Sequence, residues 1–233
     1  MVEDQRENPF SLSIGDLMAA LLLLFVLILM GVLLQLQEQV EQQNVIVDQF
    51  DDLNKELYDD LYEEFKDDLS EWNATIIDTT LAIRFKEPNM LFSSGKYELK
   101  DTFKLILEDF FPRYLDILKG KKYKDEIEEI RIEGHTSSTG SGSKDQRYLD
   151  NLNLSQMRSR VTLSYLFSEN IISEKDKPWC ISKLTANGLS FSKVILDDGG
   201  LEEKDLSRRV EFRVKIDAEK KLRDLSKMIK KGK

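Results

Sequence analysis

An uninterrupted apolar segment, residues 17–34, constrains the fold more than any other feature. Its sequence, LMAALLLLFVLILMGVLL, has eighteen residues without a charged or polar side chain. At about 1.5 Å per residue, a helix of this length spans roughly 27 Å, close to the hydrocarbon core of a bilayer. The lead MVEDQREN carries three acids and one arginine, and no small-residue cleavage site follows the segment. We therefore predict a retained transmembrane helix over 12–35 rather than a cleaved signal peptide.

The distribution of basic residues predicts the orientation of this helix. Arg6 is the one basic residue ahead of the segment, and the next is Lys55. This weak asymmetry places a lead of residues 1–11 in the cytoplasm and the rest of the chain beyond the inner membrane. The single cysteine, Cys180, permits no intramolecular disulfide and leaves the compartment open.

A carboxylate, Asp16, lies directly before the apolar segment. A charged group within a bilayer costs at least a few kcal/mol, so its presence there needs a reason. Two interpretations remain open from the residues alone. Asp16 either caps the helix outside the lipid or holds a transported cation.

Residues 36–73 contain neither glycine nor proline and have helical apolar spacing, which predicts a helical stalk. Residues 48–71 hold eleven acids and two lysines, a net charge of −9 that equals the net charge of the whole chain. Five acids follow one another at i+4, a spacing that weakens a helix by a few tenths of a kcal/mol per pair: Asp52, Glu56, Asp60, Glu64 and Asp68. We expect one helix from about 12 to 72, with either a solvated acidic face or a metastable segment that re-pairs on activation.

Residues 74–217 alternate strand and helix patterns, which predict an α+β domain with a mixed sheet and helices on one face. The expected order is β-α-β-α-β-β. The strands are expected at 75–85, 126–136, 179–190 and 208–216, and the helices at 101–118 and 153–171. A flexible loop is expected at 138–145, and Asn153 or Ser155 is expected to cap the second helix.

The composition argues against an enzyme. His135 and Cys180 are the only residues of their types and lie far apart in the sequence, so zinc or cysteine–histidine chemistry is not expected. No phosphate-binding glycine motif occurs. His135 is expected to have a structural role or to contact a ligand. The basic tail, 218–233, forms either a surface helix or a contact with an anionic polymer or lipid.

Three motifs resemble the OmpA/MotB-type peptidoglycan-binding domain over roughly 76–217. They are GHT at 134–136, the N-x-x-L-S-x-x-R pattern that begins at Asn151, and RRVE at 208–211. The resemblance implies a peptidoglycan site, and it implies these residues in it: Thr136, Ser137, Tyr148, Asn151, Leu154, Arg158 and Arg209. Ser137 replaces the aspartate of the family, which pairs with an ammonium of the peptide stem; Asp145 or Asp150 is a candidate substitute.

The sequence around Asp16, SIGDLMAA, resembles the membrane span of MotB-like subunits of ion-driven stators. The resemblance implies that Asp16 carries a proton or sodium ion. It also implies a homodimer within five MotA-like (ZorA-type) subunits, with no cofactor and no direct nucleic-acid contact. The short lead favours the stator-like subunits of Zorya anti-phage systems. A flagellar stator and a passive tether between membrane and wall are the alternatives.

Overall fold

The computed structural model describes residues 9–87, 90–168, 171–217 and 220. The chain divides into two compact units, Met1–Phe50 and Asp51–Lys233. The predicted lead lies largely outside the described residues, as does the basic tail except for Lys220.

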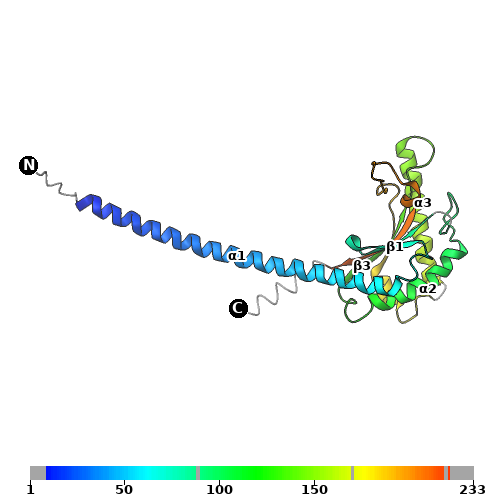
Figure 1. The fold of residues 1–233 in the computed structure, drawn as a ribbon, viewed down its shortest axis with the longest axis horizontal. Coiled ribbons are helices and arrows are strands. Elements are labelled where there is room, and N and C mark those ends of the chain that lie inside the picture. Colours follow the sequence, from blue (N-terminus) through cyan, green and yellow to red (C-terminus); the bar gives the residue numbers. More distant parts are fainter. Residues whose placement is uncertain (1–8, 88–89, 169–170, 218–219, 221–233) are drawn as a thin grey trace, which may run out of the picture. The chain divides into compact units, whose positions relative to one another are not determined.

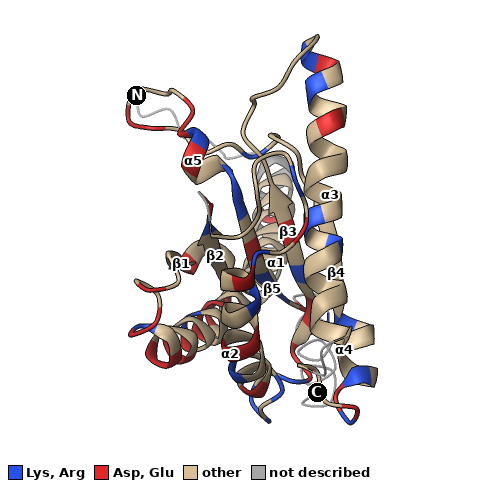
Figure 2. Ribbon diagram, turned by 90° about the vertical axis from the view of Figure 1, so that its right-hand side faces the viewer, with Lys and Arg blue, Asp and Glu red and all other residues tan. Residues whose placement is uncertain are grey.

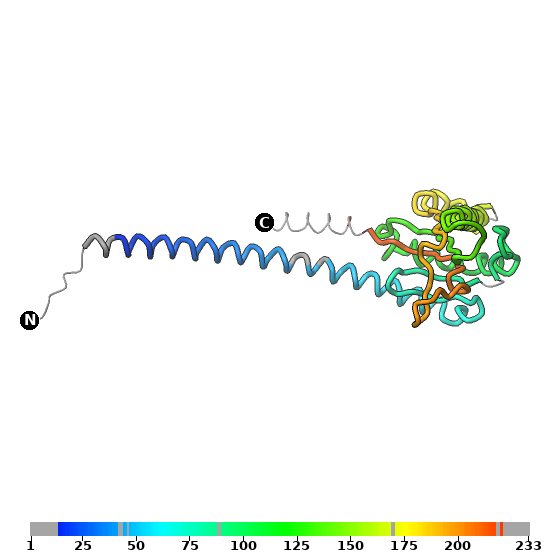
Figure 3. The backbone as a smooth tube through the Cα atoms, turned by 90° about the horizontal axis from the view of Figure 1, so that it is seen from above, coloured from blue at the N-terminus to red at the C-terminus, as the bar shows by residue number. Residues whose placement is uncertain are grey.

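Helix α1, Pro9–Phe65, begins in the first unit (Figure 1). Figure 3 follows the same helix as a tube through the Cα atoms. Its segment Ile14–Glu41 is long and apolar enough to cross a membrane, and an 18-residue window within it has a mean hydropathy of 3.2 with no part buried. This confirms the predicted apolar helix. Because the helix begins at Pro9, Asp16 lies inside it, and the interpretation of Asp16 as a helix cap is wrong.

The last turns of α1 belong to the second unit, Asp51–Lys233, which is the globular unit of the chain. The helix ends at Phe65, before the expected position near 72, and turns follow up to the first strand. Leu57, Leu61 and Phe65 are fully buried. Their spacing of four residues lines up one face of the helix, so this part of the predicted stalk packs as a core helix.

Basic residues neutralise much of the acidic row at the end of α1. Arg113 pairs with Glu64 at 2.7 Å and with Asp68 at 2.9 Å. Lys122 pairs with Glu56 at 3.1 Å and with Asp60 at 3.3 Å. Glu56, Asp60 and Glu64 stay exposed and Asp68 is half-buried, so the acidic face is solvated, as expected. The cations that the fold brings beside it offset the mutual repulsion of the acids.

The first predicted strand, 75–85, is in fact two strands. Strand β1, Ala74–Ile77, turns back through the 3-10 helix η1, Asp78–Thr80, into β2, Ala82–Lys86. Leu81 takes a left-handed conformation with φ 47° at this turn. The two strands pair antiparallel, so the expected element order gains a strand.

The sheet has five strands in the order β1-β2-β5-β3-β4. Strand β3, Ile127–His135, pairs parallel with β4, Leu184–Gly188, and antiparallel with β5, Arg209–Ile216. The sheet is mixed, as predicted. Aromatic rings from α2, Asp101–Leu118, pack on one face of the sheet. There the ring centroid of Phe110 lies 5.1 Å from the ring centroids of both Phe85 and Phe212.

Helix α3, Lys144–Ser168, covers the same face and begins earlier than expected. Asn153 and Ser155 lie within it, so the prediction that either caps it is wrong. The predicted strand 179–190 is also shorter, because its first residues belong to helix α4, Lys177–Lys183. A short helix, α5, Lys204–Ser207, precedes β5.

Two glycines let α3 lie directly on the sheet. A Cβ atom on Gly134 would lie 2.3 Å from the Ser155 carbonyl oxygen, and one on Gly188 would lie 2.3 Å from the Gln156 nitrogen. The Gln156 side chain accepts a hydrogen bond from the Gly188 N–H at 2.7 Å and donates one to the Ala186 oxygen at 3.1 Å. These contacts determine where α3 crosses the ends of β3 and β4.

Candidate functional site

A cavity of about 620 Å³ opens beside α3, at the end of β3. Five of the seven predicted site residues line it: Thr136, Ser137, Asn151, Leu154 and Arg158. Asn151, Leu154 and Arg158 come from one face of α3, because their spacing of three and four residues follows the helical repeat. Thr136 and Ser137 follow β3 directly.

The other two predicted residues lie outside this lining. The Tyr148 ring packs edge-on against Phe191, with centroids 5.4 Å apart. Arg209 is buried in the sheet, where its Nε donates to Glu211 at 2.6 Å. Its neighbour Arg208 lines the cavity instead. Of the two candidate substitutes for the family's aspartate, Asp150 lines the cavity and Asp145 does not.

Arg158 is the buried cation of the cavity, and the fold holds its guanidinium on several sides. Nη1 lies 2.9 Å from one carboxylate oxygen of Glu87, and Nη2 lies 3.4 Å from the other. Nε donates to the Lys96 carbonyl at 2.9 Å, and the guanidinium lies 4.7 Å from the Phe92 ring centroid. Burial lowers the Arg158 pKa, and the Glu87 charge opposes that shift.

Glu87 was not predicted as a site residue. It follows β2, lines the cavity and is 4% exposed. Burial raises its pKa, although the Arg158 charge acts in the opposite direction. None of the three wall-binding motifs includes Glu87, and its partner Arg158 lies 71 residues away in the sequence, so no local pattern could have linked the two residues.

The small polar residues of the cavity wall are held by local hydrogen bonds. The Ser137 and Thr139 hydroxyls lie 2.8 Å apart, and Ser137 is 1% exposed. The Asn151 amide donates to the carbonyls of Thr139 and Arg147, at 2.9 and 3.0 Å. Asn151 therefore ties α3 to the loop after β3 and shapes the wall of the cavity.

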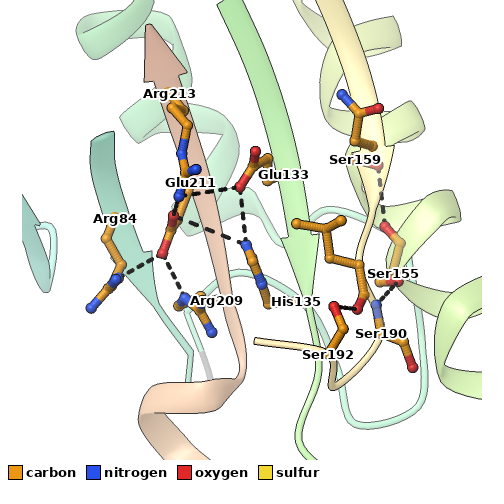
Figure 4. Close-up of polar contacts among 12 residues, drawn as sticks. Arg84, Glu133, His135, Ser155, Ser159, Ser190, Ser192, Arg209, Glu211 and Arg213 are labelled. Carbon is orange, nitrogen blue, oxygen red and sulfur yellow. Dashed lines mark hydrogen bonds and ion pairs between the residues drawn. The ribbon is translucent and has the colours of Figure 1, made fainter. Parts of the chain in front are cut away.

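A second polar cluster lies on the sheet face opposite α2 and α3, outside the cavity lining (Figure 4). Its members are Arg84, Glu133, His135, Arg209, Glu211 and Arg213. Acidic and basic residues both occur along β3 and β5 (Figure 2). Arg84 and Arg209 donate to one oxygen of Glu211, at 2.8 and 2.6 Å. Burial alone would raise the Glu211 pKa, but Arg209 and its neighbours lower it to about 2.

His135 belongs to this cluster. Its Nε2 lies 3.4 Å from Glu133 and 4.0 Å from Glu211, and burial lowers its pKa. These three residues have the composition of a metal site. However, Arg213 lies 3.7 Å from the same Glu133 oxygen and 3.4 Å from the same Glu211 oxygen. A metal ion would have to displace this guanidinium, so the residues fit an ion-pair network and not a metal.

No family model matches the sequence, and the solved structures with which it aligns share little sequence identity with it. Among solved structures, a MotB-like protein from Desulfovibrio vulgaris is 21% identical over 76% of this chain and 99% of that one, with a TM-score of 0.47. The periplasmic domain of Helicobacter pylori MotB is 17% identical over 67% of this chain and 87% of that one, with a TM-score of 0.44.

Two curated relatives cover nearly the whole chain. Zorya protein ZorB of Escherichia coli O139:H28 is 27% identical over 95% of this chain and 86% of its own length. Zorya protein ZorB of Escherichia coli strain Crooks is 40% identical over 223 residues, which cover 94% of this chain and 93% of the relative. With that identity across almost its full length, the chain belongs to the ZorB family of Zorya proteins.

Proposed function

We propose that this chain is the MotB-like subunit of an ion-driven stator complex in anti-phage defence. It crosses the bacterial inner membrane once, with its N-terminus in the cytoplasm and its globular unit in the periplasm. The globular unit binds peptidoglycan through the cavity beside α3. The observation that carries this proposal is the convergence of five predicted wall-binding residues on one cavity of about 620 Å³.

The chemistry of the cavity supports a peptide-stem ligand. Arg158 offers a planar guanidinium, which recognises a carboxylate by two parallel hydrogen bonds. Arg208 adds a second positive charge to the lining, and Leu154 and Met157 add apolar surface. A cavity that joins buried charge with apolar wall suits a ligand with a charged end and an aliphatic stem.

The membrane half of the proposal rests on Asp16. Asp16 directly precedes the apolar segment 17–34 of its helix. At this position its carboxylate can be neutralised by a proton or by a bound sodium ion. Two copies within a ring of five MotA-like subunits would present two such carboxylates. The membrane potential supplies about 2.3 kcal/mol per charge per 100 mV to drive the ion.

Sedimentation with purified sacculi tests the wall-binding half. The full-length chain in detergent is expected to co-sediment with sacculi, and joint replacement of Asn151, Leu154 and Arg158 by alanine is expected to abolish this. Arg160→Ala is the matched control, because Arg160 is exposed on the same helix and lies outside the cavity lining. Equal co-sedimentation of the triple variant and the control would reject the cavity as the wall site.

A further inference from the structure

The cavity contains a buried ion pair between Arg158, a predicted site residue, and Glu87, which belongs to none of the three motifs. Glu87 and Arg158 are 4% and 3% exposed, and both line the cavity. An ion pair removed from water stays favourable only while both charges remain matched, because an unpaired buried charge costs several kcal/mol. This restricts which ligands can enter and contact Arg158.

The two partners of the pair are held differently. The Lys96 and Ser93 carbonyls accept hydrogen bonds from Arg158, at 2.9 and 3.4 Å, and its guanidinium lies against Phe92. These contacts keep Arg158 in position without Glu87. Among the described residues, the hydrogen bonds to the Glu87 carboxylate come from Arg158. Glu87 can therefore change partner while Arg158 stays in place.

We propose that Glu87 binds the ammonium group of a zwitterionic amino-acid end while Arg158 binds its carboxylate. The ligand inserts between the two side chains, and each buried charge exchanges one partner for another of the same sign. A ligand with a carboxylate but no ammonium would leave Glu87 with the charges of Arg208 and Lys100 near it but without the hydrogen-bond donor that Arg158 supplies, so the cavity selects against such a ligand. This inference rests on the proposed function, and it makes Glu87 the specificity-determining residue of the wall site.

Asp150 is the other acid in the cavity lining, and it provides the matched comparison. It is exposed and accepts a hydrogen bond from the Gln146 amide at 2.9 Å. An exposed carboxylate is hydrated and loses little when its partner is absent. The buried Glu87 carboxylate is therefore the group that makes an ammonium on the ligand necessary.

Calorimetry with diaminopimelate and pimelate tests this inference. The two probes share a seven-carbon diacid chain, and pimelate lacks the amino groups. The full-length wild-type chain in detergent is expected to bind diaminopimelate at least about tenfold more tightly than pimelate, because a hydrogen bond between two charged groups is stronger than one between neutral groups. Glu87→Gln is expected to remove this preference, and Asp150→Asn to retain it.

Several outcomes would overturn the inference. They are an unchanged preference in Glu87→Gln, tighter binding of both probes by that variant, and loss of the preference in Asp150→Asn. Glu87→Asp keeps the negative charge beside Arg158 and so protects folding, but it withdraws the carboxylate by one methylene; it is expected to weaken the preference. Wild-type protein that co-sediments with sacculi but does not distinguish the probes contradicts this inference alone. Wild-type protein that does not co-sediment contradicts the proposed wall binding.

Discussion

The Arg113 guanidinium lies 2.7 Å from the Glu64 carboxylate and joins two segments 49 residues apart. The same side chain donates to Asp68 at 2.9 Å and lies 5.0 Å from the Phe65 ring centroid. One residue of α2 thus offsets the repulsion between two acids and covers the ring that enters the core. The end of α1 is held by charge as well as by apolar packing.

Replacing Arg113 by methionine is therefore expected to destabilise the globular unit. The change keeps apolar bulk over Phe65 but leaves Glu64 and Asp68 without their shared cation. Because the Arg113 side chain is 31% exposed, we expect a modest loss of about 1–2 kcal/mol. Chemical denaturation of the full-length chain in detergent measures this loss. The control is Lys66→Met, which removes an exposed pair within one turn; equal midpoints for the two variants would contradict a special role of Arg113.

Gly134→Ala is expected to disturb both the fold and the cavity. The new methyl group would lie 2.3 Å from the Ser155 carbonyl, so α3 must move away from β3. Such overpacking costs about 3 kcal/mol. Thermal unfolding should show this loss, and co-sedimentation with sacculi should fall because α3 carries Arg158. Gly199→Ala is the matched control, since its methyl group would meet only the Asp197 side chain, at 3.3 Å. A Gly134→Ala variant that is as stable as Gly199→Ala would disprove the close approach of α3 to β3.

Because the pKa of Glu211 is lowered, we expect the folded chain to lose stability in acid. The pKa of Glu211 falls from an ordinary value of 4.5 to about 2 in the folded chain, so the ionised carboxylate stabilises the fold by roughly 3 kcal/mol. This contribution is complete above about pH 4.5 and is lost as the pH falls toward 2. Glu211→Gln should be less stable than wild type at pH 6, and the difference should shrink as the pH falls below 4.5. Denaturation midpoints at several pH values measure this difference; a constant difference would contradict the lowered pKa of Glu211.

The sequence predicted the features that depend on local spacing. Eighteen apolar residues define a helix that can span a membrane without any tertiary information. Asn151, Leu154 and Arg158 follow the helical repeat, so they share a face wherever the helix begins. The start of α3 at Lys144 could not be read as easily, because residues 138–147 contain no large apolar side chain.

The features that were missed depend on contacts between distant residues. Glu87 meets Arg158 only after the fold brings the residue that follows β2 against α3. The cations that pair with the acidic row of α1 lie on α2 and in the turns after it. The split of the first strand also lacked a signal, since Leu81 adopts its left-handed conformation without the glycine that usually marks such a turn.

The central claim is that Asp16 carries the transported ion. Measuring ion flux and phage protection with the Asp16→Asn variant tests this claim most directly. The change keeps the size of the side chain and removes the group that binds the cation, so the complex should assemble with its MotA-like partner but conduct no ions and give no protection. Asp48→Asn, at another exposed acid of α1 outside the apolar segment, should conduct and protect normally. If Asp16→Asn retains flux and protection at the wild-type level, Asp16 is not the ion carrier, and the chain acts as a passive tether.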